Sequence, residues 1–360
     1  IAIIGGGLSG ISLAIALTTR SIPFTLYESR SSFTEIGAGI NLGPNGYRAL
    51  RLIDSSLGDE IFSIATRNPL PHEDLWMIFR RGAEMDGHGD GEVLFELTAP
   101  PTGTMTMHRR ELLAALAGRL GREDVEFGKK LVGYEDDDEG IVLRFADGAE
   151  ERASVLVGCD GVHSKVRERM FGEDNPVTKA SYTGLGAYRA VVPMERAIEA
   201  WGDSARFAQV SLGPNGYFIY YPVNGGTSAN CGAWIWKEGG WDHDEWVIPN
   251  QGEQFKEDMR DWGPRVHKML KNYDPNPSFW GSFEHGNQPD HFHEGRTILI
   301  GDGAHAMPPH QGQGASQAVE DAYVLAEVLD LVNKGDHSQH TVEAGLQAVS
   351  ETRTPRSSKI

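Results

Sequence analysis

The chain has 360 residues, of which 39% are hydrophobic, and this is enough for one large or two ordinary domains with buried cores. Its formal net charge of −18 argues against binding to nucleic acid or to an anionic membrane surface. No apolar run reaches transmembrane length, and the two cysteines, Cys159 and Cys231, lie outside any paired motif. We therefore expect a cytoplasmic protein without stable membrane insertion, disulfide framework or metal site.

The first glycine motif follows a short apolar run at the start of the chain. Residues 1–4 predict a buried strand, and Gly5, Gly7 and Gly10 then stand at G-x-G-x-x-G spacing before a helical pattern. A second strand ends at Glu28, about 20 residues further on, where an acid binds ribose hydroxyls. The pattern predicts a dinucleotide site for FAD or NAD rather than NADP. Because the chain opens inside a strand, without Met or a basic leader, we also expect residues to precede it.

The next segments carry weaker signals. Residues 37–41 form a small-residue loop that is either a plain turn or backbone passing a flat ring. Residues 75–80 and 93–97 predict strands of a second, sheet-based unit. Arg109 or Arg110 at the start of a helix opposes the helix dipole, so one of them is expected to have a partner. The acidic run over 135–139 predicts a solvated hairpin end rather than a metal site.

Residues 155–159 predict another buried strand, and this one ends at Asp160-Gly161 before a helix that contains Arg167. From residue 182 to 281 the pattern changes to short strands, expected at 186–192, 206–212, 217–222 and 229–237, with many aromatic residues. Alternation places Tyr217 and Tyr221 on one face and Tyr220 on the other, which predicts an antiparallel sheet with one face lining a pocket. Arg189 within the first of these strands either faces water or meets a charged ligand.

The last motif runs from residue 297 to 331. An apolar strand stops at Gly301-Asp302, a loop rich in Gly and Pro follows, and a helical period begins near Ala315. This layout aims free backbone N–H groups and a positive dipole end at a ligand above the loop. His291 and His293 are interpreted as part of a loop entering the strand, because no further metal ligands accompany them.

The three strand-tip motifs, in this order and spacing, resemble the group A flavoprotein aromatic hydroxylases, in particular the salicylate hydroxylase-like branch with the para-hydroxybenzoate hydroxylase fold. The resemblance covers essentially the whole chain. It is carried by GAGINLGPNG, MHRRELLAAL, VGCDGVHSKVR, GAYRAVV, GDGAHAMPPHQGQGASQAVEDA and ETRTPR. Because the chain stops soon after the last of these, we expect a C-terminal part of the family pattern to follow.

The resemblance and the strand patterns together predict an α/β fold with two domains. A Rossmann-like FAD-binding domain is expected over residues 1–72, 100–175 and 288–360. A substrate domain built on a mainly antiparallel β-sheet is expected over residues 73–99 and 176–287.

The resemblance also implies a site. The residues expected to hold the ADP half, the ribitol chain and other parts of FAD are Gly5, Gly7, Gly10, Glu28, Arg109, Asp160 and Asp302. The residues expected beside the isoalloxazine ring are Gly39, Ile40, Pro309, Gly312 and Gly314. Asp160 would also meet NADPH or NADH during its transient visit. Arg189, with Tyr220 or Tyr221 on a neighbouring strand, resembles the substrate-side pair, and Pro309 would form a wall near the reacting flavin carbon.

The implied reaction is the hydroxylation of an electron-rich phenolic or aromatic substrate. NAD(P)H reduces FAD, O₂ then gives a C4a-hydroperoxyflavin, and the phenol ring attacks its distal oxygen. Oxidative dearomatisation and decarboxylative hydroxylation remain open. A flavin halogenase is disfavoured because Trp234-Ile235-Trp236 and Trp246-Val247-Ile248-Pro249 are not joined in one motif. A non-catalytic flavin redox switch is the alternative from another class, and the protein is expected to be a monomer or homodimer.

Overall fold

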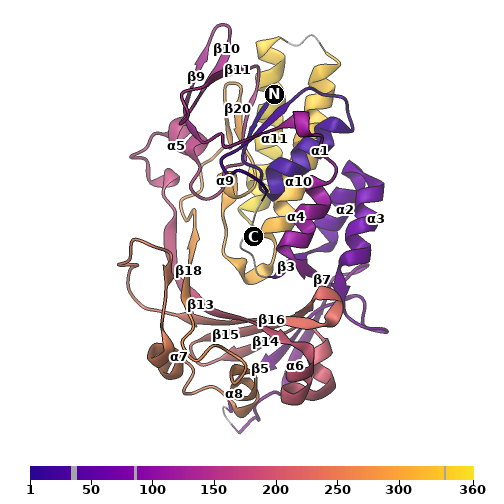
Figure 1. Ribbon diagram of the computed structural model, residues 1–360, viewed down its shortest axis with the longest axis vertical. Helices are drawn as coiled ribbons and strands as arrows, with labels where there is room; N and C mark the ends of the chain where they lie inside the picture. Colours follow the sequence, from indigo (N-terminus) through magenta and orange to yellow (C-terminus); the bar gives the residue numbers. More distant parts are fainter. Residues whose placement is uncertain (34–38, 85–86, 336–337) are drawn as a thin grey trace.

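Two large sheets stand at opposite ends of the molecule, with helices packed against each of them (Figure 1). The computed structural model describes residues 1–33, 39–84, 87–335 and 338–360. One sheet is almost entirely parallel and the other mostly antiparallel. The predicted α/β class, with a second and mainly antiparallel sheet, is therefore confirmed.

The parallel sheet joins segments that are far apart in sequence. Its order is β19 (His293–Glu294), β20 (Thr297–Leu299), β12 (Leu156–Gly158), β1 (Ala2–Ile4), β2 (Thr25–Glu28) and β8 (Val125–Phe127). Only β19 runs antiparallel to its neighbour. Ile3 pairs with Leu26 on one side and Val157 on the other, and all three are fully buried. The carboxyl ends of β1, β12 and β20 consequently lie side by side, and these are the three strands that precede the glycine motifs.

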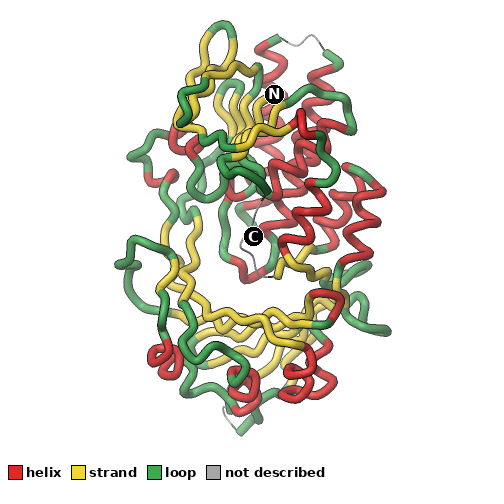
Figure 2. The backbone as a smooth tube through the Cα atoms, in the orientation of Figure 1, coloured by secondary structure: helices red, strands yellow, loops and turns green. Residues whose placement is uncertain are grey.

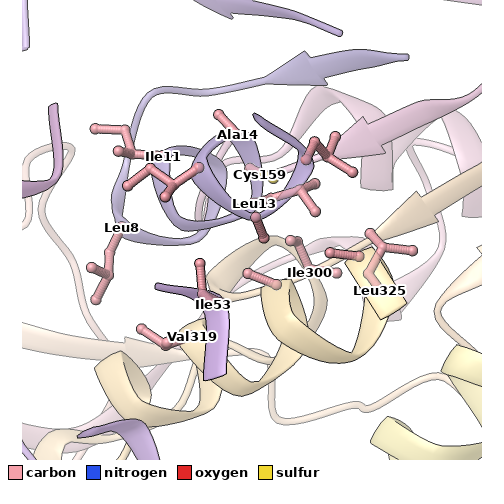
Figure 3. Packing of buried hydrophobic residues seen from close by; sticks show 14 of the residues in the cluster. Leu8, Ile11, Leu13, Ala14, Ile53, Cys159, Ile300, Val319 and Leu325 are labelled. Atoms are coloured by element: carbon pink, nitrogen blue, oxygen red, sulfur yellow. The ribbon is translucent and has the colours of Figure 1, made fainter. Parts of the chain in front are cut away.

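Helices cover one face of this sheet and form its main core with it. They are α1 (Leu8–Thr18), α2 (Pro44–Ile53), α3 (Ser55–Ile64), α4 (Arg109–Ala117), α10 (Gly314–Asn333) and α11 (Gln339–Ser357). Leu8, Ile11 and Leu13 of α1 pack close to Val319 and Leu325 of α10 (Figure 3). Every residue of α1 from Leu8 to Leu17 is buried, as expected for a helix that is apolar on all sides.

The opposite face of the parallel sheet carries a small antiparallel sheet and a short helix. The strands are β9 (Leu131–Asp137), β10 (Gly140–Phe145) and β11 (Glu150–Ala153), and the helix is α5 (Lys165–Phe171). The acidic run ends the β9–β10 hairpin, where Glu135 pairs with Arg144 in solvent. The predicted solvated hairpin is therefore confirmed.

The second large sheet has eight strands. Its order is β17 (Val247–Ile248), β18 (Phe279–Glu284), β13 (Ser181–Pro193), β16 (Ser228–Trp236), β15 (Gly216–Val223), β14 (Gln209–Gly213), β5 (Leu75–Arg81) and β6 (Val93–Thr98). All neighbouring pairs are antiparallel except β14 and β5. The strand expected over 206–212 begins only at Gln209, because residues 202–206 form a 3-10 turn.

The two faces of this sheet have different neighbours. Helices α6 (Met194–Trp201), α7 (Gly252–Asp258) and α8 (Pro264–Leu270) cover its outer face, away from the parallel sheet (Figure 2). The inner face turns toward the parallel-sheet lobe. Between the lobes, β3 (Gly39–Leu42), β7 (Met105–His108) and β4 (Thr66–Arg67) form a three-stranded sheet. The start of the predicted small-residue loop, residues 37 and 38, lies outside the described residues.

Within the predicted substrate domain, residues 73–99 and 176–287, every strand lies in the eight-stranded sheet. The boundaries themselves stay a prediction. In the described ranges, no helix is both long enough and apolar enough to cross a bilayer.

Candidate active site

A cavity of about 1220 Å³ lies between the parallel-sheet lobe and the inner face of the eight-stranded sheet. Its lining comes from the ends of β1, β12 and β20, from the loop before α10, and from strands β13, β15 and β16. Pockets for single small ligands usually measure roughly 300–1,000 Å³. This cavity is therefore large enough for an extended cofactor together with a small substrate.

The loop between β1 and α1 is shaped for a phosphate group. Gly5 has φ +105°, and a Cβ atom there would lie 2.4 Å from the carbonyl oxygen of Cys159. A Cβ at Gly10 would lie 1.9 Å from the carbonyl oxygen of Gly5, whereas a Cβ at Gly7 would meet open space. Helix α1 begins at Leu8 without a side-chain cap, so its first N–H groups are left for a ligand. Gly7 lines the cavity at this point.

Glu28 lies at the end of β2 and lines the cavity. Its carboxylate accepts hydrogen bonds from the backbone N–H groups of Gly6 and Arg30, each at 2.7 Å. These bonds fix the side chain beside the glycine loop and leave lone pairs on both oxygens. Such a carboxylate can accept hydrogen bonds from ribose hydroxyls.

Asp160 lies at the end of β12 and also lines the cavity. Its carboxylate accepts hydrogen bonds from the Ser164 hydroxyl at 2.5 Å and from the Lys165 N–H at 2.7 Å. These bonds cap helix α5, and burial raises the pKa of the carboxyl. Asp160 therefore holds its own helix as well as facing the cavity.

Asp302 follows β20, begins the short helix α9 (Asp302–His305) and lines the cavity. Further along, Pro309 lies in a 3-10 turn and Gly312 adopts the left-handed conformation, with φ 62° and ψ 28°. Gly314 begins α10 without a side-chain cap. The remaining predicted cofactor residues, Gly39, Ile40 and Arg109, line the same cavity.

Arg189 lies on the inner face of the eight-stranded sheet. Its guanidinium carbon is 5.5 Å from the ring centre of Trp234 and 5.3 Å from that of Trp280. The side chain is accessible from the cavity, yet the protein atoms around it lower its pKa by desolvation. A cation held over aromatic rings in a partly desolvated site favours an anionic ligand.

Three tyrosines of β15 have hydroxyl groups with different partners. The Tyr217 hydroxyl is 2.9 Å from Nδ1 of His310, and the Tyr221 hydroxyl donates to the carbonyl oxygen of Gly39 at 2.9 Å. Tyr220 is fully buried on the outer face, where its hydroxyl donates to the carbonyl oxygen of Ala205 at 2.6 Å. Of the two tyrosines expected on the substrate side, Tyr220 is therefore the wrong one, because its place in the strand turns it away from the cavity. Tyr217 and Tyr221 both line the cavity.

Several contacts were not expected from the sequence. His310, next to Pro309, meets Tyr217 from across the cavity, and its ring also lies over Trp236. Trp280, from β18, adds a second ring beside Arg189. Asp321 is a buried carboxylate within α10. Of these residues, only Asp321 could have been noticed in the sequence, because it is an acid among apolar residues at helical spacing.

The cavity fits FAD by three observations. The glycine loop leaves room for a phosphate at an uncapped helix start, Glu28 stands where a ribose would follow, and the cavity continues to Pro309 and the start of α10. Within the described ranges, no group of three or more His, Cys, Asp or Glu residues is arranged to hold a metal ion.

These features define a site that fits FAD. The family model of the FAD binding domain matches residues 1–360, and the chain belongs to this family of FAD-dependent monooxygenases.

Two relatives and one solved structure resemble the chain over at least 99% of its length. It is 36% identical over 370 residues to 6-methylsalicylate 1-monooxygenase of Aspergillus terreus, covering 100% of the chain and 80% of that protein. It is 33% identical over 378 residues to salicylate hydroxylase of Pseudomonas putida, covering 100% and 82%. The solved structure of a salicylate hydroxylase substrate complex superposes with a TM-score of 0.85 at 29% identity, covering 99% of the chain and 85% of that structure.

Proposed function

We propose that this chain hydroxylates an electron-rich phenol, with FAD as cofactor and NAD(P)H and O₂ as co-substrates. One oxygen atom of O₂ enters the ring and the other leaves as water, while NAD(P)H provides two electrons. When bound, FAD would supply the electron transfer from NAD(P)H and the activation of O₂. The residues of the chain would bind the phenol, orient it and exclude water.

The observation that carries this proposal is the position of Arg189. Its guanidinium faces the cavity, with Trp234 and Trp280 around it and the Pro309 loop among the other lining segments. A fixed positive charge in a partly desolvated site lowers the pKa of a nearby phenol and so makes the ring a better nucleophile. The surrounding aromatic side chains would hold a flat substrate and keep water from it.

A second candidate reaction is decarboxylative hydroxylation of an ortho-hydroxybenzoate. It is supported by the same Arg189, which can pair with a carboxylate, and by the names of two relatives that refer to salicylate and 6-methylsalicylate. In this reaction the oxygen atom replaces the carboxyl group, which leaves as CO₂. A phenol with an alkyl group at the attacked carbon would instead give a dearomatised product.

The test is a panel of phenols, with and without an ortho carboxylate, mixed with FAD-loaded protein and either NADH or NADPH. We expect at least one phenol to accelerate NAD(P)H oxidation and to give a product with one added oxygen. CO₂ release would identify the decarboxylative reaction. If no member accelerates NAD(P)H oxidation and the flavin stays oxidised throughout, the protein is a flavin redox switch and the proposal fails.

Replacing Arg189 by glutamine then tests the role of its charge. Arg189→Gln should lower kcat/KM by roughly a hundredfold, since a partly desolvated charge contact is removed. The rate should also require higher pH, because the phenol pKa is no longer lowered. Arg206→Gln is a matched control, since Arg206 is exposed and 3.7 Å from Asp203. Equal activity and an unchanged pH profile in Arg189→Gln would remove Arg189 from the mechanism.

A further inference from the structure

A buried ionic cluster lies directly behind the Gly301–Asp302 turn. We call His305, Asp321 and Arg353 the Asp321 cluster. The Asp321 carboxylate accepts hydrogen bonds from the Gly301 N–H at 2.8 Å, from Arg353 Nε at 2.6 Å and from His305 Nε2 at 2.7 Å. All three side chains are at most 5% exposed. The cluster lies outside the lining of the cavity, so its residues do not meet a ligand there themselves.

The position of the cluster is unusual for a helix core. Asp321 is one of the buried residues of α10, the helix that contributes Val319 and Leu325 to the main core (Figure 3). Arg353 reaches it from α11 and also donates to the Gln317 side chain at 2.6 Å. Ion pairs buried in this way add little stability compared with apolar side chains of similar size. A role in fixing a neighbouring segment gives a reason for charges at this place.

The segment they fix is helix α9 with the turn before it. Asp321 holds the start of this segment through the Gly301 N–H and its end through the His305 ring. Gly301 has φ 60° and ψ −144°, a conformation available almost only to glycine, and a Cβ there would lie 2.7 Å from the Ser9 hydroxyl. Asp302, between the two anchor points, is one of the residues that line the cavity. One carboxylate thus bonds to both ends of the segment that contains Asp302.

We propose that Asp321, held by Arg353, is a positioning residue of the cofactor site, which fixes the Gly301–His305 segment so that the Asp302 carboxylate stands ready to bind FAD. The inference rests on the proposed contact between Asp302 and FAD. It adds α11 to the elements on which cofactor binding depends, although α11 contributes no residue to the cavity lining.

A double-mutant cycle on FAD affinity tests the proposal. Apoprotein is titrated with FAD, and flavin fluorescence gives the Kd for the native chain, Asp302→Ala, Asp321→Asn and the double variant. Asp321→Asn should raise Kd by roughly tenfold or more, since bonds to two charged groups are weakened. In the Asp302→Ala background the same change should have little effect, because the residue through which it acts is gone. Additive effects, or a native Kd in Asp321→Asn, would overturn the proposal.

The matched control is Asp330→Asn, in the same helix. Asp330 pairs with Lys334 at 2.6 Å near the surface, so its change should leave the Kd for FAD as it is. Thermal unfolding of each apoprotein shows whether the fold is kept. If Asp321→Asn does not fold, His305→Gln serves instead, because it leaves the bonds of Asp321 to Gly301 and Arg353 in place. A severalfold rise in Kd that disappears in the Asp302→Ala background supports the proposal, and an unchanged Kd refutes it.

The titration needs neither NAD(P)H nor a phenol. Failure of the proposed hydroxylation with a non-additive cycle would therefore refute the proposed function alone. Hydroxylation with an additive cycle would refute only the role of Asp321.

Discussion

Three tyrosines in one strand can be used to test whether hydrogen bonds from the eight-stranded sheet fix the backbone on the cofactor side of the cavity. Tyr217, Tyr220 and Tyr221 all belong to β15, and each hydroxyl has a different partner: His310, Ala205 and Gly39 respectively. Replacing each by phenylalanine removes one oxygen atom and keeps the ring. The series therefore compares three hydrogen bonds within the same strand.

The energetic effects of two of these changes are expected to match. Tyr220 and Tyr221 are both buried, and each donates to one backbone carbonyl, at 2.6 and 2.9 Å. Loss of such a bond, with the carbonyl left unpaired, lowers the free energy of unfolding by about 1–2 kcal/mol. Urea unfolding of both apoproteins should therefore show similar losses. Tyr217→Phe should lose less, since its partner His310 is exposed.

The functional effects should differ. Tyr221 holds Gly39, where a Cβ atom would lie 2.6 Å from the tyrosine ring, and the next residue, Ile40, lines the cavity beside the expected flavin ring. If the native position of this backbone is stabilised by about 1 kcal/mol less, its population relative to displaced positions falls about fivefold. In Tyr221→Phe we expect FAD to remain bound, but the yield of product per NAD(P)H to fall severalfold, with hydrogen peroxide released instead. Tyr220→Phe should keep the native yield.

The assay measures hydroxylated product, NAD(P)H consumed and hydrogen peroxide formed in the same reaction. Tyr217→Phe should mainly raise KM, because Tyr217 lines the cavity beside Trp234. The reasoning is refuted if Tyr220→Phe uncouples the reaction as strongly as Tyr221→Phe, since the effect would then follow stability and not position. It is equally refuted if Tyr221→Phe keeps the native yield.

Two further predictions concern the glycine loop and acid stability. Gly10→Ala should destabilise the apoprotein by about 1–3 kcal/mol through its clash with Gly5, whereas Gly7→Ala should leave apoprotein stability native and weaken only FAD binding, as thermal unfolding and FAD titration would show. Gly7→Ala with native FAD affinity would contradict the phosphate assignment. Burial acts to raise the pKa of Asp321, but contacts with His305, Arg353 and the Gly301 N–H outweigh it and lower the pKa to about 2. The stabilising effect of the carboxylate is therefore present above about pH 4 and is lost as pH falls toward 2. Between about pH 5 and about pH 2, the free energy of unfolding measured with urea should therefore fall by about 2 kcal/mol less in Asp321→Asn than in the native chain. Parallel pH profiles of the two proteins would contradict this.

The sequence was informative wherever a local pattern determines the structure. The strand–glycine–helix motif at Gly5 and the acid at Glu28 predicted both the elements and their meeting point, because parallel strands bring their carboxyl ends to one edge. Alternation correctly placed Tyr217 and Tyr221 on one face of β15 and Tyr220 on the other. It could not decide which face met the cavity, since that depends on how the lobes pack.

The contacts missed by sequence reasoning all join segments distant in the chain. Tyr217 meets His310 across 93 positions, and Tyr221 meets Gly39 across 182. Such pairs leave no periodic pattern in the sequence, because each contact depends on how one lobe packs against the other. Arg353 and Asp321, separated by 32 positions, lie on neighbouring helices and show only as charges on otherwise apolar helix faces.

Each of these long-range contacts holds a backbone segment that lies beside the expected flavin position. The Tyr221 hydroxyl, from the eight-stranded sheet, donates to Gly39, and the Tyr217 hydroxyl contacts His310 in the loop that contains Pro309. Asp321 holds the Asp302 turn from behind. The expected flavin position is thus bounded by backbone segments, and each of them is fixed by a side chain from another element. Under the proposed function, a phenol that displaces Tyr217 or Tyr221 would alter the cofactor side of the cavity and would by this physical route change the rate of flavin reduction.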